Sequence, residues 1–315
     1  ASKEQAQRQQ VQPYNNAPIW RDVRSEQEHQ TQVRGVETGV LIQSEGETWR
    51  ALRNGPISLY GGLLLVVIFT VILLFHLVHG AIKVHSPPTG KMIRRFSDWE
   101  RWVHWSVAIT FCILAVSGLI ILFGKHVLLP IFGYTLFSWL AILSKNLHNF
   151  VGPLFVVSAI VMFITYVKDN LWKSYDFRWF KNMGGMLGGE HIPSGKYNAG
   201  EKVWFWIGLF VLTLIAGITG LILDFPNFGQ GRAIMQQANV IHAIAAILFT
   251  VLSLGHIYMG TIGVEGAYDT MRGNGEVDEA WAKEHHEYWY NDVKAGRTRQ
   301  PAQGKVAAGQ VPQSS

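Results

Sequence analysis

The sequence predicts an all-α membrane protein with five transmembrane helices, and three observations lead to this fold class. Of the 315 residues, 49% are hydrophobic and only 16% are charged. Five apolar stretches are each about twenty residues or longer, which is enough to cross a hydrocarbon core of about 30 Å as a helix. Polar segments rich in Lys, Arg, Glu and Gln separate and flank these stretches. We therefore expect a protein that resides in the lipid bilayer and has no nucleic-acid partner.

The apolar stretches have recognisable ends. The second stretch is preceded by Ser97-Asp98-Trp99-Glu100, an S-x-x-E capping box that predicts a helix N-terminus. The region between Lys125 and Lys145 is predicted to be a loop with one short interfacial helix. The five predicted spans are residues 57–80, 99–124, 147–167, 203–223 and 239–263.

The chain is expected to have four parts. Residues 1–56 form a polar N-terminal arm, and residues 57–80 form an additional transmembrane helix. Residues 93–263 contain the other four spans, which we expect to pack as a bundle. Residues 264–315 form a polar C-terminal part with a helical stretch, followed from about Lys294 by a tail predicted to be disordered.

The distribution of charge predicts an orientation in the membrane. Lys and Arg are frequent after the first, third and fifth spans and rare after the second and fourth. The positive-inside rule places the first group of segments in the cytoplasm. The C-terminus is then cytoplasmic and the N-terminal arm periplasmic, in the inner (cytoplasmic) membrane of a bacterium.

Four histidines lie near the ends of three of the spans. His242 and His256 are 14 residues apart in the fifth span, so on a helix both imidazoles project from roughly one face, about 21 Å apart along the axis. With the predicted orientation, His104 and His256 lie near the cytoplasmic surface, whereas His148 and His242 lie near the periplasmic surface. Ionisable side chains inside a span are costly, so these two pairs indicate a functional site.

Two opposed imidazoles are what a b-type haem with two histidine ligands requires, since each offers one nitrogen to iron and an apolar bundle encloses the porphyrin. Such a haem has no open coordination position and is suited to electron transfer. A copper site and a proton relay are the alternatives. A relay would more often include intramembrane Asp or Glu, and Asp224 is the only acidic residue within residues 203–263. Cys112 is the single cysteine, which excludes an internal disulfide and a cysteine-ligated iron–sulfur cluster.

Six short segments carry a family resemblance: RWVHW (101–105), LHNFVG (147–152), KYNAGEK (196–202), VIHAIAAIL (240–248), GHIYMG (255–260) and WAKEHHEYWY (281–290). Together they resemble the cytochrome b (gamma) subunit of membrane-bound respiratory formate dehydrogenases over about residues 93–292. The KYNAG and HH-x-x-WY patterns separate this resemblance from the related cytochrome b anchors of nickel–iron hydrogenases and thiosulfate reductases. The four-helix form of the family lacks the arm and the first span of this chain.

The resemblance implies a non-catalytic electron-transfer subunit of a formate:quinone oxidoreductase. Its two haem b groups would be held by His104 with His256 and by His148 with His242. The implied partners are a catalytic subunit with a molybdopterin centre of molybdenum or tungsten, and an iron–sulfur subunit with a membrane anchor of its own. Electrons would enter at the periplasmic haem and leave at the cytoplasmic haem.

The same resemblance implies that the electrons leave to a quinone, menaquinone or ubiquinone, bound against Asn198, Gly200 and His256. A turn that enters the fourth span would offer the Gly200 amide and the Asn198 side-chain amide to the quinone oxygens, at the positive end of a helix dipole. A plain helix cap by Asn198 is the alternative interpretation of this turn. Glu201 and Lys202 are expected to supply protons from the cytoplasm.

Other functions are compatible with the sequence. The same cytochrome could serve a nickel–iron hydrogenase or another molybdoenzyme, which the copurifying subunits would distinguish. A haem-free anchor or transporter is a different class and would show no visible absorption. Arg94, Arg95 and Arg101 are candidates to pair with haem propionates, and His285 and His286 are expected to be a solvated or interface-facing pair.

Overall fold

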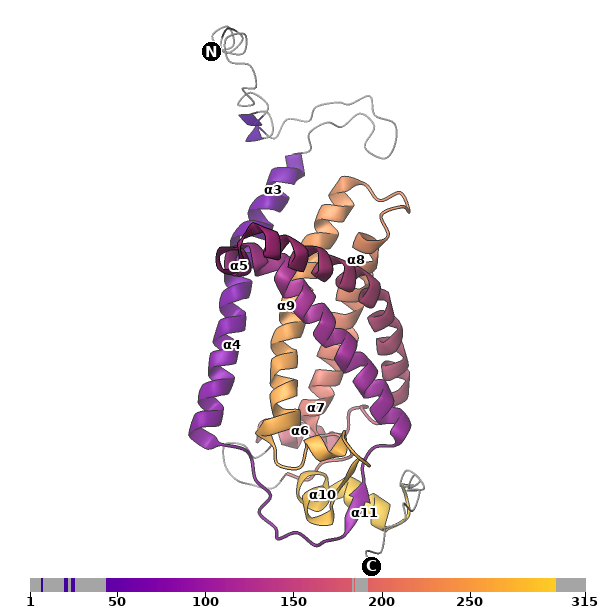
Figure 1. The fold of residues 1–315 in the computed structure, drawn as a ribbon. Coiled ribbons are helices and arrows are strands. Elements are labelled where there is room, and N and C mark those ends of the chain that lie inside the picture. Colours follow the sequence, from indigo (N-terminus) through magenta and orange to yellow (C-terminus); the bar gives the residue numbers. More distant parts are fainter. Residues whose placement is uncertain are drawn as a thin grey trace, which may run out of the picture. The chain divides into compact units, whose positions relative to one another are not determined.

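The structure, a computed structural model, is almost entirely helical over the part of the chain that it describes (Figure 1). The predicted disordered tail from residue 299 onward and most of the predicted N-terminal arm lie outside the described residues. The described residues are 44–182, 184 and 192–298, together with Gln7, Trp20, Arg21, Arg24 and Ser25.

Four helical segments of the described residues are long and apolar enough to cross a membrane, so the chain is that of a multi-pass membrane protein. They contain 34, 69, 26 and 32 residues. Five spans were predicted, and the second segment covers two of them. The main helices of the four segments are α4 (Ser58–His79), α5 (Asp98–Tyr166), α8 (Thr213–Asp224) and α9 (Arg232–Tyr258).

The loop predicted between Lys125 and Lys145 is wrong. This region belongs to helix α5 and is helical apart from one break at Gly133. Gly133 has φ 70° and ψ 175°, a left-handed backbone conformation that glycine adopts without a Cβ clash. A straight helix of this length would be about 100 Å long, several times the thickness of a hydrocarbon core. The stretch is mostly apolar, and Pro130 and Gly133 are not part of a cluster of turn-forming residues, which explains why it stays helical. The capping box predicted at the start of α5 is confirmed.

The first membrane segment starts before the predicted span. The helix begins with α3 (Ser44–Leu52) instead of at Ile57, and it reaches α4 through the π-helical turn η1 (Arg53–Ile57). Pro56 lies in that turn. A wider π-helical turn accommodates a residue that has no N–H to donate.

The third segment is a continuous helical run that starts at α7 (Ala199–Val203). It passes through the π-helical stretch η3 (Trp204–Leu212) before it becomes α8. In the fourth segment, α9 continues into a third π-helical element, η4 (Met259–Gly263), and a 3-10 turn, η5 (Tyr268–Thr270), follows. Local π-helix often marks functional sites in helices.

The chain divides into two compact units, each assembled from pieces of several helices. Unit 1 contains His148 and His242, and unit 2 contains His104 and His256. Each predicted histidine pair therefore belongs to one unit. Unit 1 comprises Ala1–Val67, Leu114–Pro153 and Leu214–Thr250, and unit 2 comprises Ile68–Ile113, Leu154–Thr213 and Val251–Ser315.

The additional helix α4 contacts α9 within each unit. In unit 1, Gly61 lies so close to Ile247 that an added Cβ would be 2.5 Å from its Cδ1 atom. In unit 2, His76 Nδ1 is 3.2 Å from the Tyr258 hydroxyl. Most other side chains of α4 are apolar and exposed, which suits a helix surrounded by lipid.

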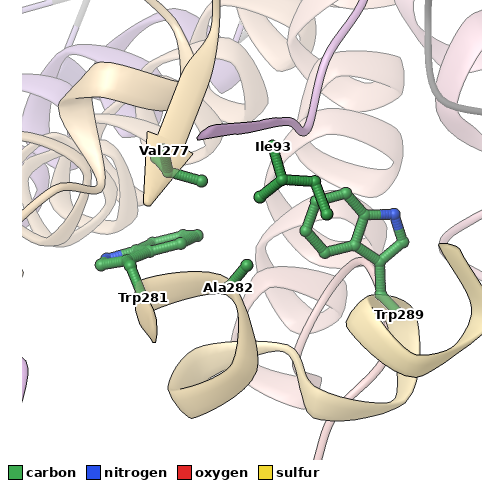
Figure 2. Close-up of a cluster of buried hydrophobic side chains, with 5 residues drawn as sticks. All are labelled: Ile93, Val277, Trp281, Ala282 and Trp289. Atoms are coloured by element: carbon green, nitrogen blue, oxygen red, sulfur yellow. The ribbon is translucent and has the colours of Figure 1, made fainter. Parts of the chain in front are cut away.

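Outside the membrane segments, unit 2 contains a small C-terminal module. Strand β1 (Met92–Arg94) pairs antiparallel with β2 (Glu276–Asp278), and α10 (Glu279–His285) and α11 (Glu287–Lys294) follow. The predicted helical stretch is thus confirmed, whereas the strands were not predicted, because three residues are too few for an alternating pattern. Figure 2 shows the buried core of the module, formed by Ile93, Val277, Trp281, Ala282 and Trp289.

A buried ion pair joins α6 (Ser174–Lys181) to α7. Lys202 Nζ lies 2.7 Å from Asp176 Oδ2, and the two side chains are only 2% and 1% exposed. Asp176 Oδ2 also accepts the Lys173 backbone amide at 2.6 Å. A charge buried this deeply needs its partner, because the loss of one member leaves the other without compensation.

We expect Lys202→Met to lower the free energy of unfolding by about 3 kcal/mol or more, since it leaves the Asp176 carboxylate buried without its counter-charge. Thermal unfolding in detergent, followed by circular dichroism, measures the loss. The double variant with Asp176→Leu and Lys202→Met removes both charges and should recover most of it. A single variant as stable as the wild type, or a double variant no better than the single one, would contradict this expectation.

Candidate functional site

His148 on α5 and His242 on α9 face each other in unit 1. Their ring centroids are 6.0 Å apart, and the rings are inclined at 82°. Two imidazoles that bind one metal ion through bonds of about 2 Å each have ring centres about 6 Å apart. The structure therefore brings these two residues to the separation that a shared metal ion requires.

The Nδ1 atom of His242 is a hydrogen-bond donor. It lies 3.0 Å from the Ala216 carbonyl and 3.2 Å from the Thr219 hydroxyl oxygen. A carbonyl can only accept, so Nδ1 carries the proton and Nε2 keeps its lone pair for a metal ion.

His148 has the same tautomer, because its Nδ1 atom also meets an acceptor. Its Nδ1 atom lies 2.9 Å from Ser117 Oγ. That hydroxyl already donates to the Leu114 carbonyl at 3.2 Å, so its oxygen accepts the imidazole N–H. The Nε2 atom of His148 is again left to bind a metal ion.

Glycines let both imidazoles lie close to a neighbouring helix. A Cβ on Gly118 would be 3.2 Å from His148 Cε1, and a Cβ on Gly220 would be 3.1 Å from His242 Cε1. Neither glycine was connected with a histidine in the sequence analysis. The signal that could have found them is a repeated pair, a hydroxyl residue followed by glycine, on each helix that faces a ligand.

His104 on α5 and His256 on α9 form the second pair, in unit 2. Their ring centroids are 6.3 Å apart, at an angle of 57°. The indole of Trp204 stacks on the His256 ring at 4.6 Å and 10°. Gly208 makes room for this indole, because a Cβ there would be 2.6 Å from two of its ring atoms. His104 Nδ1 is buried and has no hydrogen-bond partner among the described residues.

Each pair fits a haem held by two axial histidines. Such a group needs only two ligands from the protein, in apolar surroundings. The four histidines are half-buried within apolar helices. No cluster of three or more His, Cys, Asp or Glu residues that could hold a bare metal ion occurs in the described parts of the chain. Two imidazoles in each pair match the number and type of ligands that such a haem requires.

The KYNAG turn, residues 196–200, forms the N-terminus of a helix. Asn198 Oδ1 accepts the Glu201 backbone amide at 2.9 Å, and Glu201 Oε2 accepts the Asn198 backbone amide at 2.8 Å. The capping role of Asn198 is thereby confirmed. It occupies Oδ1 and leaves Nδ2 as a donor. The N–H of Gly200, in the first helical turn, has no acceptor inside the helix.

Trp179 of α6 lies against this turn. A Cβ on Gly200 would be 2.9 Å from Trp179 Cη2 and 3.2 Å from Asn198 Oδ1. Only glycine fits here without moving the indole. Trp179 could not be predicted from the sequence, because nothing in the local pattern connects α6 with the KYNAG turn.

Arg95, next to β1, holds the turn in place. Its guanidinium donates to the Lys196 carbonyl at 2.5 Å and to the two carboxylate oxygens of Glu201 at 2.9 Å and 3.1 Å. The Arg95 side chain is only 4% exposed. Charge-assisted hydrogen bonds of this kind are stronger than neutral ones, so the turn is rigidly positioned.

The other arginines near the start of α5 are also paired. Arg94 and Arg101 both contact Asp98, and Arg101 also donates to the Gly273 carbonyl. The three arginines considered as partners of haem propionates are therefore engaged with acceptors of the chain itself. A propionate would have to compete with these acceptors.

His285 and His286 were expected to be a solvated or interface-facing pair, and for His286 a solvated position is wrong. His286 is 2% exposed, and its Nδ1 donates to the Gly195 carbonyl at 2.8 Å. Burial lowers the pKa of His286 well below its ordinary value, and the charge of Arg95 lowers this pKa further. The His285 ring stacks on Trp281 at 4.8 Å. The C-terminal module is thus hydrogen-bonded to Ser194 and Gly195, which directly precede the KYNAG turn.

Known proteins are similar to most of this chain. Residues 95–273 match the prokaryotic cytochrome b561 family. The formate dehydrogenase cytochrome b556(fdo) subunit of Escherichia coli is 35% identical over 211 residues, which cover 64% of this chain and 93% of the relative. The nitrate-inducible formate dehydrogenase cytochrome b556(Fdn) subunit of Escherichia coli is 32% identical over 220 residues, with coverages of 68% and 97%. The cytochrome b556 subunit of Haemophilus influenzae formate dehydrogenase is 30% identical over 224 residues, with coverages of 67% and 87%.

We expect the C-terminal module to lose stability as the pH falls through about 6.5, the ordinary pKa of histidine. The unfolded segment then binds a proton that the buried His286, with its lowered pKa, does not bind. His286→Gln should destabilise the module more at about pH 7.5 than at about pH 5.5, since the wild type has lost this contribution at the lower pH. Hydrogen–deuterium exchange of α10 and α11, corrected for the intrinsic effect of pH, measures the difference. His126→Gln, outside the module, should leave it unchanged, and equal destabilisation by His286→Gln at both pH values would refute the expectation.

Proposed function

Because the chain belongs to the prokaryotic cytochrome b561 family, we propose that it is the membrane-anchored cytochrome b subunit of a formate dehydrogenase and passes electrons from periplasmic subunits to quinone. The subunit takes no part in the oxidation of formate itself. Its task requires two haem b groups and a quinone site.

The observation that carries the proposal is one opposed histidine pair in each compact unit, with ring separations of 6.0 Å and 6.3 Å. His148 and His242 hold what we call the unit 1 haem, and His104 and His256 hold the unit 2 haem. A haem with two histidine ligands supplies one-electron transfer and has no open position for a substrate. The protein contributes the ligands, their orientation and the apolar surroundings.

The proposed topology has five spans, with the N-terminus in the periplasm and the C-terminus in the cytoplasm of a bacterial inner membrane. Helix α5 supplies two spans, because 69 residues far exceed what one crossing needs and Gly133 lies near the middle of the helix. The distribution of Lys and Arg supports the orientation. In this topology the unit 1 haem lies toward the periplasm and the unit 2 haem toward the cytoplasm.

The KYNAG turn is the proposed quinone site. Asn198 Nδ2 and the Gly200 N–H are donors at the N-terminus of a membrane helix, where negative charge that develops on quinone oxygens is stabilised. Trp204, about one turn further along, stacks on His256 and connects this site to a ligand of the unit 2 haem. Donors held in place before the reaction need no reorganisation during it.

Glu201 is the residue that we propose to pass protons to the quinone. Its side chain is 34% exposed and pairs with Arg95. Lys202 was expected to share this role, but its side chain is buried in the ion pair with Asp176 and is only 2% exposed. We assign Lys202 a structural role instead.

The proposed partners are a periplasmic catalytic subunit, with a molybdopterin centre of molybdenum or tungsten, and an iron–sulfur subunit with a membrane anchor. These subunits would deliver electrons to the unit 1 haem. The relatives named above are subunits of formate dehydrogenases, which favours formate over hydrogen as the electron source. Copurification of a hydrogenase subunit with this chain would reverse that choice.

Pyridine haemochromogen analysis of the purified protein should find two haem b groups per chain. His242→Ala and His256→Ala should each reduce this number to about one, because each removes one axial ligand. His76→Ala is the matched control, since His76 lies in a membrane helix but belongs to neither pair, and it should retain both haems. A well-folded wild type without haem would leave the chain as an anchor or transporter.

Asn198→Asp should slow quinone reduction at least about tenfold, the equivalent of one lost hydrogen bond. Aspartate still caps the helix but replaces the Nδ2 donor with a negatively charged acceptor. The rate at which a soluble quinone reoxidises dithionite-reduced haem measures the effect without any partner subunit. If Asn198 serves only as a cap, Asn198→Asp will react as fast as the wild type.

A further inference from the structure

We propose that Ser117 and Thr219 make the unit 1 haem the lower-potential member of the pair, so that electrons run downhill to the unit 2 haem. The proposal deepens the proposed function and rests on it, since it presupposes two haems. Ser117 and Thr219 contact the ligands His148 and His242 and are not ligands themselves.

The same three-part arrangement meets each histidine of unit 1. On α8, the Ala216 carbonyl and the Thr219 hydroxyl accept from His242, and Gly220 lies against its ring. These groups are at positions i, i+3 and i+4, which share one face of a helix. On α5 the same spacing recurs at 114, 117 and 118, where His148 contacts the Leu114 carbonyl, the Ser117 hydroxyl and Gly118. A repeat of this kind on two separate helices points to a shared function.

Both hydroxyl oxygens are held in the accepting role. Thr219 Oγ1 donates to the Ile215 carbonyl at 2.6 Å, and Ser117 Oγ donates to the Leu114 carbonyl at 3.2 Å. Each oxygen can then only accept the N–H of its histidine. An acceptor on Nδ1 makes the imidazole a more basic ligand. A more basic ligand favours the ferric form of iron, which carries the larger positive charge, and therefore lowers the reduction potential.

Unit 2 holds its ligands differently. His104 Nδ1 is buried and, within the described residues, has no acceptor. The His256 ring is oriented by the stacked indole of Trp204. Stacking orients the ring but offers no acceptor for its N–H, so it does not make the imidazole more basic. The ferric form of the unit 2 haem is therefore stabilised less than that of the unit 1 haem. In the transfer that these potentials would favour, the iron of the unit 1 haem would be oxidised from ferrous to ferric and that of the unit 2 haem reduced from ferric to ferrous, without movement of a proton.

An optical redox titration of the purified haem-containing protein tests this inference. The wild type should show two one-electron steps, of which His242→Ala abolishes the lower and His256→Ala the upper. Ser117→Ala and Thr219→Val should each raise the lower potential and leave the upper one unchanged. We expect each variant to change the redox equilibrium about tenfold, which corresponds to about 59 mV for one electron.

Two matched variants separate the hydrogen bond from general packing. Thr110→Val changes a threonine that is also buried, at 6% exposed, and whose hydroxyl also donates to its own helix, at 2.7 Å to the Ser106 carbonyl. It should shift neither step. Thr219→Ser keeps the hydroxyl and should retain the wild-type potential.

The outcomes separate the inference from the proposed function. Two haems whose potentials do not respond to Ser117→Ala or Thr219→Val, or whose upper step responds, would overturn the inference and leave the proposed function intact. The same holds if Thr110→Val shifts the lower step as much as Thr219→Val does. A wild type with fewer than two steps would overturn the proposed function, and the inference with it.

Discussion

Burying an imidazole among apolar helices is costly unless its N–H finds an acceptor, and the two histidine sites differ in how far they meet this constraint. In unit 1 the acceptors are a serine and a threonine hydroxyl, each followed by a glycine that lets the ring approach. In unit 2 an indole stacked on His256 takes that place, and a glycine makes room for the indole. One type of ligand thus lies in two different environments.

Charged groups in unit 2 are also paired, since each buried charge among the residues that the structure describes has a partner. The Arg95 guanidinium meets the Glu201 carboxylate, and Lys202 meets Asp176. These pairs surround the KYNAG turn, and the C-terminal module adds a hydrogen bond from His286 to the segment before it. Among the described residues, these groups occupy Asn198 Oδ1 and leave Asn198 Nδ2 and the Gly200 N–H as donors. Rigid, unused donors are what stabilisation of developing charge requires.

Several features could be predicted from the sequence because they depend on neighbours along the chain. Apolar length identifies a multi-pass membrane protein, and Ser97 with Glu100 identifies the start of α5. Histidines inside apolar stretches are rare enough to mark a site, and their positions near span ends suggested which would meet. The KYNAG and HH-x-x-WY patterns led to the cytochrome b family without any structure.

Only the tertiary structure decided the environment of each of these groups. It made the predicted loop around Gly133 helical, buried His286 within the C-terminal module, and brought Ser117 and Thr219 to the imidazoles. The physical reason is that the free energy of burying a polar group depends on partners that other helices supply, far away in the chain. The sequence by itself determined the class of protein and the identity of the candidate ligands. What surrounds each ligand, and therefore what distinguishes the two sites, depends on packing.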